Sequence, residues 1–372
     1  MRIVLLEPYY TGSHAAWVDG YVAASRHQVI PLTLKGQFWK WRMHGGAVTL
    51  ARRFREQGLQ ADLILATDML DLTTFLALTR DRTSHLPAAL YLHENQLTYP
   101  LPPGERRDVH YGFINYASAL VADAVFFNSA FHLESFFDEL PRLLKHFPDH
   151  NELATVHSLM HKSHVLPLGL DLARFDAHRP TGVSDDLAPP LLLWNHRWEY
   201  DKNPAQFFEA LFALQSEGLD FRVALLGEHF VRVPPEFEHV QARLGERIVR
   251  FGYAEDFSTY ARWLWQADIV VSSAIHDFFG AAVIEALYCH CFPVLPHRLT
   301  YPALVPPAHH GRCLYRNADE LVTLLRQAVT DIAPVRQFSL RRQVARYDWS
   351  TMAGTYDAAL ETVQFSGATV RR

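Results

Sequence analysis

Short apolar runs alternate with stretches of helical periodicity through the first half of the chain. Six runs have the length of buried strands: RIVLL (2–6), QVIPL (28–32), DLILA (62–66), AALYL (88–92), AVFFN (124–128) and HVLPL (164–168). Between several of them, apolar residues recur every three to four positions: 14–25, 71–79, 110–122 and 130–140. Because both faces of a parallel sheet are covered, its strands are continuously apolar, and this alternation predicts an α/β domain with a parallel sheet.

The alternation is interrupted at 171–190, a stretch rich in Pro, Asp and Gly that has no apolar period. Five strand-like runs follow it: LLLW (191–194), FRVALLG (221–227), RIVRFG (247–252), DIVVSS (268–273) and CFPVL (291–295). We therefore predict two Rossmann-like domains in series. The expected boundaries are as follows: an N-terminal domain at 1–172, a linker at 173–189, a C-terminal domain at 190–345 and a C-terminal helix at 346–365.

Length and composition fit a globular protein of two domains. The chain has 372 residues, more than one ordinary core accommodates, and 49% of them are hydrophobic. No apolar run reaches about 18 residues, so no membrane-spanning helix is expected. The apolar run at the start is short and meets Glu7 at once, which argues against a secretory signal. We expect a cytoplasmic protein with no membrane partner, and the sequence leaves its oligomeric state open.

The three cysteines predict neither a disulfide scaffold nor a metal site. An odd, small number of cysteines fits a reducing compartment. Cys289 and Cys291 flank a histidine, but zinc sites usually space their ligands C-x₂₋₄-C and need a second pair, which is missing here. The net charge of −5 gives no global footprint for nucleic acid, so such a partner would need a local patch.

Open α/β sheets bind ligands at the carboxyl ends of their strands, and two such domains in tandem are expected to face one interdomain cleft. After the first strand, Gly12 permits a tight turn, and Ser13 is an expected N-cap for a helix that starts near His14. After the fourth strand come four consecutive polar residues, HENQ at 93–96. Four hydrogen-bonding side chains in a row at a strand end favour a function over a purely structural role.

The first strand of the second domain opens onto NHRWEYDKNP (195–204). Arg197 and Lys202 are five residues apart, and Pro204 suits the first turn of the next helix. An arginine fork and a lysine cation at a helix N-terminus are suited to a diphosphate. A solvated loop with internal ion pairs explains this stretch alone equally well.

Two acids eight residues apart, Asp277 and Glu285, follow the fourth strand of the second domain. Gly280 stands where a helix is expected to begin, so neighbouring N–H groups can meet an anion. Glu285 falls in an apolar helix, where a carboxylate needs a hydrogen-bonding partner. A ribose diol is a natural partner, and an unidentified Arg or Lys is the alternative.

These two segments carry a family resemblance. Arg-x₄-Lys followed by acid-x₇-Glu with an aromatic-Gly step resembles the donor site of retaining GT-B glycosyltransferases of the GT4-like group. Six stretches, in both domains and in the same order, resemble the tRNA-queuosine α-mannosyltransferase family: LLEPYYTGSHAAWVDG, LYLHENQLTYP, HYGFINYASALVADAVFFNSAFHLESF, WNHRWEYDKNP, HDFFGAAVIEALYCHCFPVLP and YDWSTMAGTYDAAL. The resemblance implies a GT-B fold whose C-terminal helix returns toward the N-terminal domain.

The resemblance also implies an activity. The family transfers mannose, with retention, from GDP-mannose to the cyclopentenediol of queuosine at the anticodon wobble position of an aspartate tRNA. It implies that Arg197 and Lys202 bind the diphosphate, that Asp277 contacts the sugar and that Glu285 contacts the ribose. Asp277 departs from the group, which usually has Glu there, so the sugar contact is the role that the resemblance supports least. No D-x-D occurs, so we expect a metal-independent enzyme without a cofactor.

Further site residues are assigned by the same resemblance. Backbone N–H groups near Phe279 and Gly280 are expected to assist the donor, and Gly252 and Tyr253 to lie near the nucleobase. The acceptor is expected near Gly12, Ser13, His14, Glu94, Asn95 and Gln96. His93 is expected beside the sugar, so the catalytic set is His93, Arg197, Lys202 and Asp277.

A basic segment at 35–55 offers a local patch for tRNA. It has aromatic residues at 38, 39 and 41, no acid, and six cations: Lys35, Lys40, Arg42, Arg52, Arg53 and Arg55. Cations for phosphates with aromatic rings for bases are a recurring way to hold single-stranded RNA. A basic amphipathic helix at 47–55 with its tryptophans packed inward is an equal alternative. Arg106 and Arg107 would extend the patch.

Other functions stay open on the sequence. One is a GT4-like transferase with another nucleotide sugar or with a lipid or glycan acceptor, because donor motifs say little about acceptors. The absence of an obvious basic amphipathic membrane helix disfavours a lipid. A nucleic-acid-binding protein with a degenerate donor site is disfavoured by the intact Arg, Lys and two acids. An epimerase acting on the nucleotide sugar alone is the last alternative.

Overall fold

The chain folds into two compact units. The structure, a computed structural model, describes residues 1–101, 104–146, 148–181, 187–227 and 235–370. Unit 1 comprises residues 1–170 and 347–372, and unit 2 comprises residues 171–346. The two parts of unit 1 join where Leu170 N–H donates to Tyr347 O (2.8 Å) and Trp349 N–H donates to Leu170 O (3.0 Å).

Unit 1 is built on one sheet of parallel strands in the order β2-β1-β3-β4-β5-β6. Its strands are β1 (Arg2–Tyr10), β2 (Gln28–Lys35), β3 (Leu63–Thr67), β4 (Ala88–Leu92), β5 (Ala124–Phe127) and β6 (Ser163–Val165). Successive residues of β1 enter different cores: Ile3 and Leu5 face one, and Val4 and Leu6 face the other. Both faces of the sheet are therefore buried, which explains the continuous apolar runs in the sequence.

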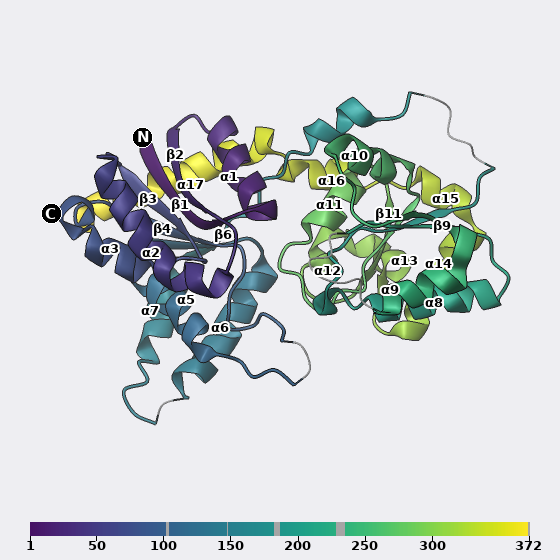
Figure 1. The fold of residues 1–372 in the computed structure, drawn as a ribbon, viewed down its shortest axis with the longest axis horizontal. Helices are drawn as coiled ribbons and strands as arrows, with labels where there is room; N and C mark the ends of the chain where they lie inside the picture. Colours follow the sequence, from purple (N-terminus) through teal and green to yellow (C-terminus); the bar gives the residue numbers. More distant parts are fainter. Residues whose placement is uncertain (102–103, 147, 182–186, 228–234, 371–372) are drawn as a thin grey trace. The chain divides into compact units, whose positions relative to one another are not determined.

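The helices of unit 1 cover both faces of this sheet (Figure 1). They are α1 (Gly12–Ala24), α2 (Trp39–Glu56), α3 (Leu72–Leu78), α4 (Arg80–Thr83), α5 (Val109–Val121), α6 (Ala130–Leu144), α7 (Ala154–His161) and α17 (Trp349–Val370). The last of them, α17, drawn in yellow in Figure 1, packs beside α1. Trp17 Nε1 donates to Tyr356 Oη (3.0 Å) across this contact. The C-terminal helix thus belongs to the N-terminal unit, as the resemblance implied.

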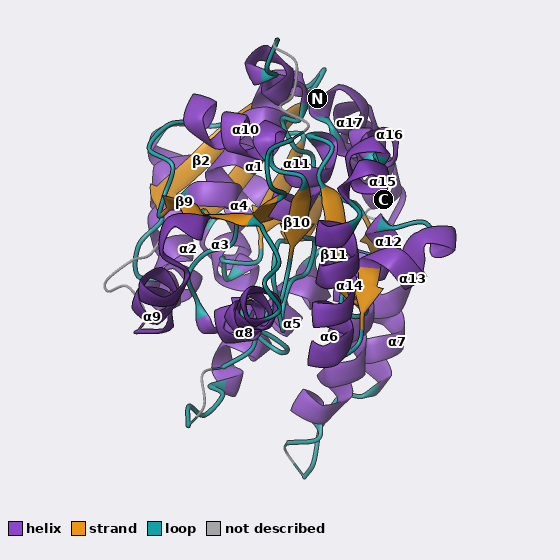
Figure 2. Cartoon of the chain, turned by 90° about the vertical axis from the view of Figure 1, so that its right-hand side faces the viewer, coloured by secondary structure: helices purple, strands orange, loops and turns teal. Residues whose placement is uncertain are grey.

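Unit 2 has a second parallel sheet, in the order β12-β11-β10-β7-β8-β9. Its strands are β7 (Leu191–Trp194), β8 (Arg222–Leu225), β9 (Ile248–Phe251), β10 (Ile269–Val271), β11 (Phe292–Pro296) and β12 (Leu314–Tyr315). The two-residue β12 was not predicted. Helices flank the strands (Figure 2), with α8 packed against α14 and α10 against α11.

The helices of unit 2 start within the residues predicted to form the linker. The α-helices are α8 (Pro204–Ser216), α9 (Pro235–Leu244), α10 (Phe257–Gln266), α11 (Ala281–Tyr288), α12 (Tyr301–Leu304), α13 (His310–Cys313), α14 (Ala318–Thr330), α15 (Ile332–Gln337) and α16 (Arg341–Val344). The short 3₁₀ helices are η1 (Ala173–His178), η2 (Tyr200–Lys202), η3 (Gly245–Arg247), η4 (Pro307–His309) and η5 (Ala345–Tyr347). Residues 173–178 of the predicted linker therefore form the helix η1, which packs on α10 through the buried Phe175. Residues 182–186 of the predicted linker lie outside the described part of the chain.

Two helix starts differ from their predictions. Helix α1 begins at Gly12, so Thr11 rather than Ser13 occupies the N-cap position. Helix α2 begins at Trp39, eight residues before the predicted start at 47 (47 − 39 = 8), after Phe38 in the left-handed region. Within the described residues, no helix is both long and apolar enough to cross a membrane.

Candidate active site

The loops that follow β7 and β10 meet in the middle of the second sheet. Strands β7, β8 and β9 run in sequence to one edge, and the chain then returns to place β10 on the other side of β7. The strand order reverses between β7 and β10, and ligands of open α/β sheets bind at such a switch point. This topology brings Lys202, from the loop after β7, close to Asp277, from the loop after β10.

Lys202 is the cation buried in this junction. Its Nζ lies 3.0 Å from Asp201 Oδ2 and 3.8 Å from Asp277 Oδ2, and it donates to His276 O at 2.9 Å. The side chain of Ser273 holds the backbone next to it, because Ser273 Oγ donates to Lys202 O (2.8 Å). A buried ammonium between two carboxylates is held in a fixed place, unlike a lysine in a solvated loop.

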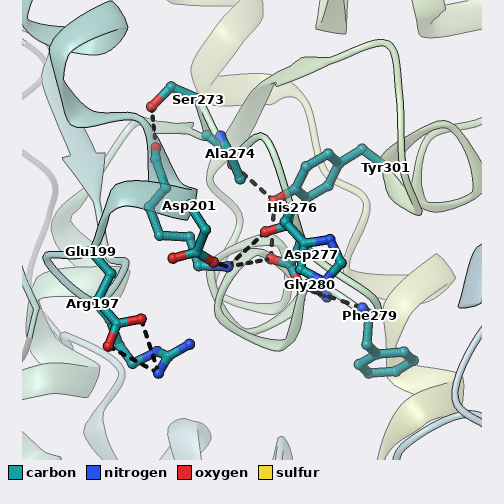
Figure 3. Close-up of polar contacts among 12 residues, drawn as sticks. Arg197, Glu199, Asp201, Ser273, Ala274, His276, Asp277, Phe279, Gly280 and Tyr301 are labelled. Carbon is teal, nitrogen blue, oxygen red and sulfur yellow. Dashed lines mark hydrogen bonds and ion pairs between the residues drawn. The ribbon is translucent and has the colours of Figure 1, made fainter. Parts of the chain in front are cut away.

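Asp277 closes the turn that starts α11. Its Oδ1 accepts from the N–H groups of Gly280 (2.9 Å) and Phe279 (3.3 Å), and its Oδ2 accepts from Tyr301 Oη (3.0 Å) (Figure 3). Burial raises the pKa of Asp277, but Lys202 and these hydrogen bonds outweigh it, so the pKa lies below its ordinary value. Asp277 is thus a carboxylate at neutral pH, and it occupies the two N–H groups that were predicted to assist the donor.

Gly280 is required by its backbone at this turn. It has φ +81°, and a Cβ added there would lie 3.3 Å from Tyr301 Cε1. Any other residue would therefore be strained and crowded against the ring that binds Asp277.

Arg197 is placed differently from Lys202. Its side chain is exposed and pairs with Glu199 (Nη1 to Oε2, 3.1 Å), to one side of the Asp277 cluster in Figure 3. The two acids of the NHRWEYDKNP stretch thus each pair with one cation: Glu199 with Arg197, and Asp201 with Lys202. His196, between Trp194 and Arg197 in this loop, is buried, and its Nε2 has no hydrogen-bond partner among the described residues. Burial lowers the pKa of His196 to about 4, so it is neutral at physiological pH.

Glu285 is held by a tyrosine, and among the described residues it pairs with no cation. Tyr260 Oη, from α10, donates to Glu285 Oε2 at 2.6 Å, and Asn195 Nδ2 lies 3.1 Å from the same hydroxyl. Asn195 also donates to Ala282 O (2.8 Å), which joins the end of β7 to α11. Burial raises the pKa of Glu285 to about 7, and the hydrogen bond from Tyr260 opposes this rise. The sequence signals neither Tyr260 nor Asn195 as a partner, because only the tertiary fold brings them to Glu285.

The residues predicted near the nucleobase follow β9. Gly252 has φ +101° and makes the turn out of the strand, and Tyr253 is 60% exposed. The carbonyl oxygen of Tyr253 accepts from Arg250 Nη2 (2.8 Å).

Unit 1 has a second polar cluster at the carboxyl ends of its strands. Glu7 is fully buried in β1 and accepts from His14 Nδ1 (2.9 Å) and from Tyr9 N–H (2.7 Å). The His14 ring lies against the His93 ring, with centroids 4.3 Å apart. Burial opposes a charge on His14, but Glu7 outweighs it and raises the pKa of His14 to about 9, whereas burial and His14 lower the pKa of His93 well below its ordinary value. A charged His14 thus lies beside a neutral His93.

The backbone of His93 is fixed from two sides. Asp68, after β3, accepts from His93 N–H (2.7 Å), and Asn128, after β5, donates to His93 O (2.8 Å). Burial raises the pKa of Asp68 above its ordinary range. His93 Nε2 is buried and has no hydrogen-bond partner among the described residues. Sequence reasoning missed Glu7 and Asp68, whose signal is a carboxylate directly within or after an apolar strand.

The other HENQ residues have structural partners. Asn95 Oδ1 accepts from the N–H groups of Leu97 and Thr98, so the buried Asn95 shapes the turn. Gln96 Nε2 donates to Glu94 Oε1 (2.8 Å). Arg106 and Arg107 are both exposed, and Arg107 donates to the carbonyl oxygens of Gln96 and Tyr99. Gly12 (φ +50°) and Ser13 are exposed at the start of α1.

One group of described residues has the composition of a metal site. The ligating atoms of Glu7, His14 and His93 lie within 4.8 Å of one another. Glu7 Oε2 and His14 Nδ1 are already joined by a hydrogen bond (2.9 Å). Cys289 and Cys291 are buried free thiols, and Cys291 Sγ contacts Leu264 O (3.2 Å).

The architecture is that of GT-B glycosyltransferases. HepE from Anabaena in complex with UDP has a TM-score of 0.68 at 14% identity, over 97% of this chain and 100% of that chain. A sucrose-phosphate synthase from Thermosynechococcus elongatus has a TM-score of 0.69 at 15% identity, over 98% of this chain and 100% of that chain. These structures establish the class through the fold alone.

Sequence comparison identifies the family within this class. A model of the tRNA-queuosine alpha-mannosyltransferase N-terminal region matches residues 2–170. The tRNA-queuosine alpha-mannosyltransferase of Drosophila melanogaster is 34% identical over 332 residues, covering 87% of this chain and 86% of the relative. A GDP-mannose-dependent alpha-(1-6)-phosphatidylinositol dimannoside mannosyltransferase of Mycobacterium tuberculosis is 27% identical over 205 residues, 54% of this chain and 52% of the relative. The chain belongs to the tRNA-queuosine α-mannosyltransferase family and is a glycosyltransferase, as the resemblance predicted.

Proposed function

We propose that this protein transfers mannose from GDP-mannose to the cyclopentenediol of queuosine at the wobble position of aspartate tRNA. Family membership supports queuosine in tRNA as the acceptor, since the Drosophila relative is named a tRNA-queuosine alpha-mannosyltransferase. More distant relatives whose names contain GDP-mannose support the donor. The observation that carries the chemistry is the buried Lys202 ammonium at the switch point, next to the carboxylate of Asp277.

Unit 2 supplies the donor-binding groups in this proposal. Lys202 and the exposed Arg197 bind the diphosphate. Asp277 accepts a hydrogen bond from a hydroxyl of mannose, and Glu285 accepts one from a hydroxyl of the ribose. Lys202 is already fixed by Asp201, so its charge needs little reorganisation when the donor binds. Arg197 must leave Glu199 to reach a phosphate, and its exposure allows this movement. No metal ion is required, because the two cations provide the positive charge that a leaving diphosphate needs.

The transfer step exchanges one bond at the anomeric carbon of mannose. The bond from this carbon to the β-phosphate oxygen breaks, and a bond to one hydroxyl oxygen of the cyclopentenediol forms. The proton of that hydroxyl passes to the departing phosphate oxygen, so that GDP and mannosyl-queuosine are the products. The configuration is retained when the hydroxyl approaches from the face that the phosphate leaves. Lys202 stabilises the negative charge that develops on the phosphate.

Unit 1 supplies the acceptor-binding groups. The unpartnered Nε2 of neutral His93 offers a hydrogen bond to a sugar or acceptor hydroxyl. The charged pair of Glu7 and His14 holds the His93 ring in place through the ring contact.

A gene deletion tests this function in cells. Nucleosides from the tRNA of wild-type and deletion cells are separated and analysed by mass spectrometry. We expect queuosine carrying one hexose in wild-type cells and unmodified queuosine after the deletion. Unchanged nucleosides, together with turnover of a nucleotide sugar by the purified protein, would favour a lipid or glycan acceptor instead.

A further inference from the structure

One surface of unit 1 combines exposed aromatic rings with cations that lack acidic partners. It lies between the end of β2 and the first turn of α2, and we call it the 35–42 surface: Lys35, Phe38, Lys40, Trp41 and Arg42. Phe38 is 77% exposed and Trp41 is 65% exposed. Among the described residues, none of its three cations forms an ion pair with a carboxylate. An exposed apolar patch beside polar residues often marks an interaction site.

Phe38 is held in an unfavourable backbone conformation. It has φ 52° and ψ 57°, in the left-handed region, and occupies the N-cap position of α2. A bulky residue is uncommon there, and glycine or asparagine would fit without strain. Because the Phe38 ring is exposed, its burial does not compensate for this strain. The stability of the fold therefore does not explain a phenylalanine at this position.

Trp41, on the first turn of α2, also exposes its ring to solvent. A Cβ added at Gly45 would lie 2.7 Å from Trp41 Cε2 and 2.9 Å from Trp41 Cζ2. Gly45 therefore allows the indole to lie close against the helix, while most of the ring stays in solvent. Such an arrangement offers a flat, preoriented stacking surface.

The remaining cations of the basic segment are engaged within the protein. Arg52 pairs with Glu56 (2.7 Å) and Arg55 pairs with Asp81 (2.6 Å). Arg53 Nη1 donates to Thr33 O (2.9 Å). Arg42 Nε likewise donates to Lys35 O (3.1 Å), within the 35–42 surface itself. The predicted six-cation patch is thus reduced to its first part, in which Lys35 and Lys40 are the exposed cations.

The 35–42 surface is continuous with the acceptor-binding groups of unit 1. Lys35 pairs with Tyr10 at the end of β1, and His14 lies four residues further along the chain (14 − 10 = 4), in the first turn of α1. Trp39, between Phe38 and Lys40, packs on Tyr111 (centroids 5.0 Å apart) in a cluster that includes Tyr9. The Tyr9 ring in turn contacts His14 (5.8 Å).

We propose that the 35–42 surface binds the single-stranded anticodon loop of the acceptor tRNA, with Phe38 and Trp41 stacking on unpaired bases and Lys40 and Lys35 contacting phosphates. This inference rests on the proposed function for its choice of RNA. Phosphates complement a segment without acids, and aromatic rings stack on bases of any sequence. A membrane fits less well, because the apolar face of α2 (Met43, Ala47, Leu50 and Phe54) is buried in unit 1 and cannot enter a bilayer.

Binding of a fluorescently labelled anticodon stem-loop RNA to the full-length protein tests this inference. Phe38→Gly removes the ring and relieves the positive φ, and Trp41→Ala leaves a good helix former, so both variants should fold. We expect each to raise the dissociation constant at least about five-fold, as loss of one stacked base predicts. Trp41→Phe should restore most of the affinity, and Arg52→Ala, on the same helix, is the matched control that should change nothing.

The salt dependence of the same binding separates the cations. The logarithm of the association constant should fall with the logarithm of the salt concentration, and Lys40→Ala should make this slope shallower by about one. Arg52→Ala should leave the slope unchanged. Unchanged RNA affinity in Phe38→Gly and Trp41→Ala would overturn the inference. It would equally be overturned if these variants lost only binding to phosphatidylserine vesicles or only self-association measured by sedimentation. Because the assay measures binding and not transfer, absence of mannosyl transfer by the wild type would refute the proposed function without deciding this inference.

Discussion

Replacement of Glu285 by glutamine should change the pH dependence of folding stability. Burial raises the pKa of Glu285 from 4.5 to about 7. Between these values the folded protein keeps a proton that the unfolded chain has released, so stability falls as pH rises through this window. At about 1.4 kcal/mol per pKa unit, this pKa shift corresponds to a loss of about 3 kcal/mol in the free energy of unfolding across the window. Glutamine does not titrate, and its amide oxygen can still accept from Tyr260.

Urea unfolding of wild type and Glu285→Gln from about pH 5 to pH 8 measures this effect. The stability of the variant relative to wild type should increase with pH by up to about 3 kcal/mol, because contributions from other groups cancel in the difference. Glu255→Gln, at an exposed position of the same unit, controls for the change in net charge. A difference that does not vary with pH would refute the reasoning. Tyr260→Phe removes the bond that lowers the Glu285 pKa, so it should move the pH-dependent loss of stability to higher pH.

Three further predictions concern other positions. Lys202→Met leaves two carboxylates buried without their cation, so it should destabilise unit 2 by about 3 kcal/mol or more. It should also abolish GDP binding in calorimetry, and an unaltered GDP affinity would remove Lys202 from the donor site. Gly280→Ala places a Cβ at φ +81° next to Tyr301 and should cost about 1 kcal/mol or more in urea unfolding. Glu7→Gln should lower the pKa of His14 from its value of about 9, as measured by NMR titration. In the wild type, the raised pKa of His14 stabilises the folded protein below about pH 6.5, and this contribution is lost as the pH rises through 9; the variant should lack it.

The apolar strands were predictable because a sheet covered on both faces leaves a continuous apolar run in the sequence. The two-residue β12 carries too few residues for such a signal. The start of α2 was missed because Phe38, with positive φ and no capping side chain, carries none of the usual signals of a helix N-terminus.

The proximity of the proposed donor residues was predictable from their positions along the chain, because parallel strands bring their carboxyl ends to one edge. This rule pointed to Lys202 and Asp277 as candidates, and their contact follows from the adjacency of β7 and β10. It did not identify the partner of Glu285, since Tyr260 comes from a helix and no local pattern marks it. The same limit applies to Glu7, a buried strand carboxylate whose partner, His14, lies on the next helix.

The most direct test of the account is transfer by the purified protein. The protein is incubated with GDP-mannose and with aspartate tRNA that contains queuosine, and the nucleosides are analysed by mass spectrometry. Addition of one hexose to queuosine, with release of GDP, is the predicted result, and the same tRNA without queuosine should remain unmodified. Failure to modify queuosine in the presence of GDP-mannose, by a protein that binds GDP, would contradict the account.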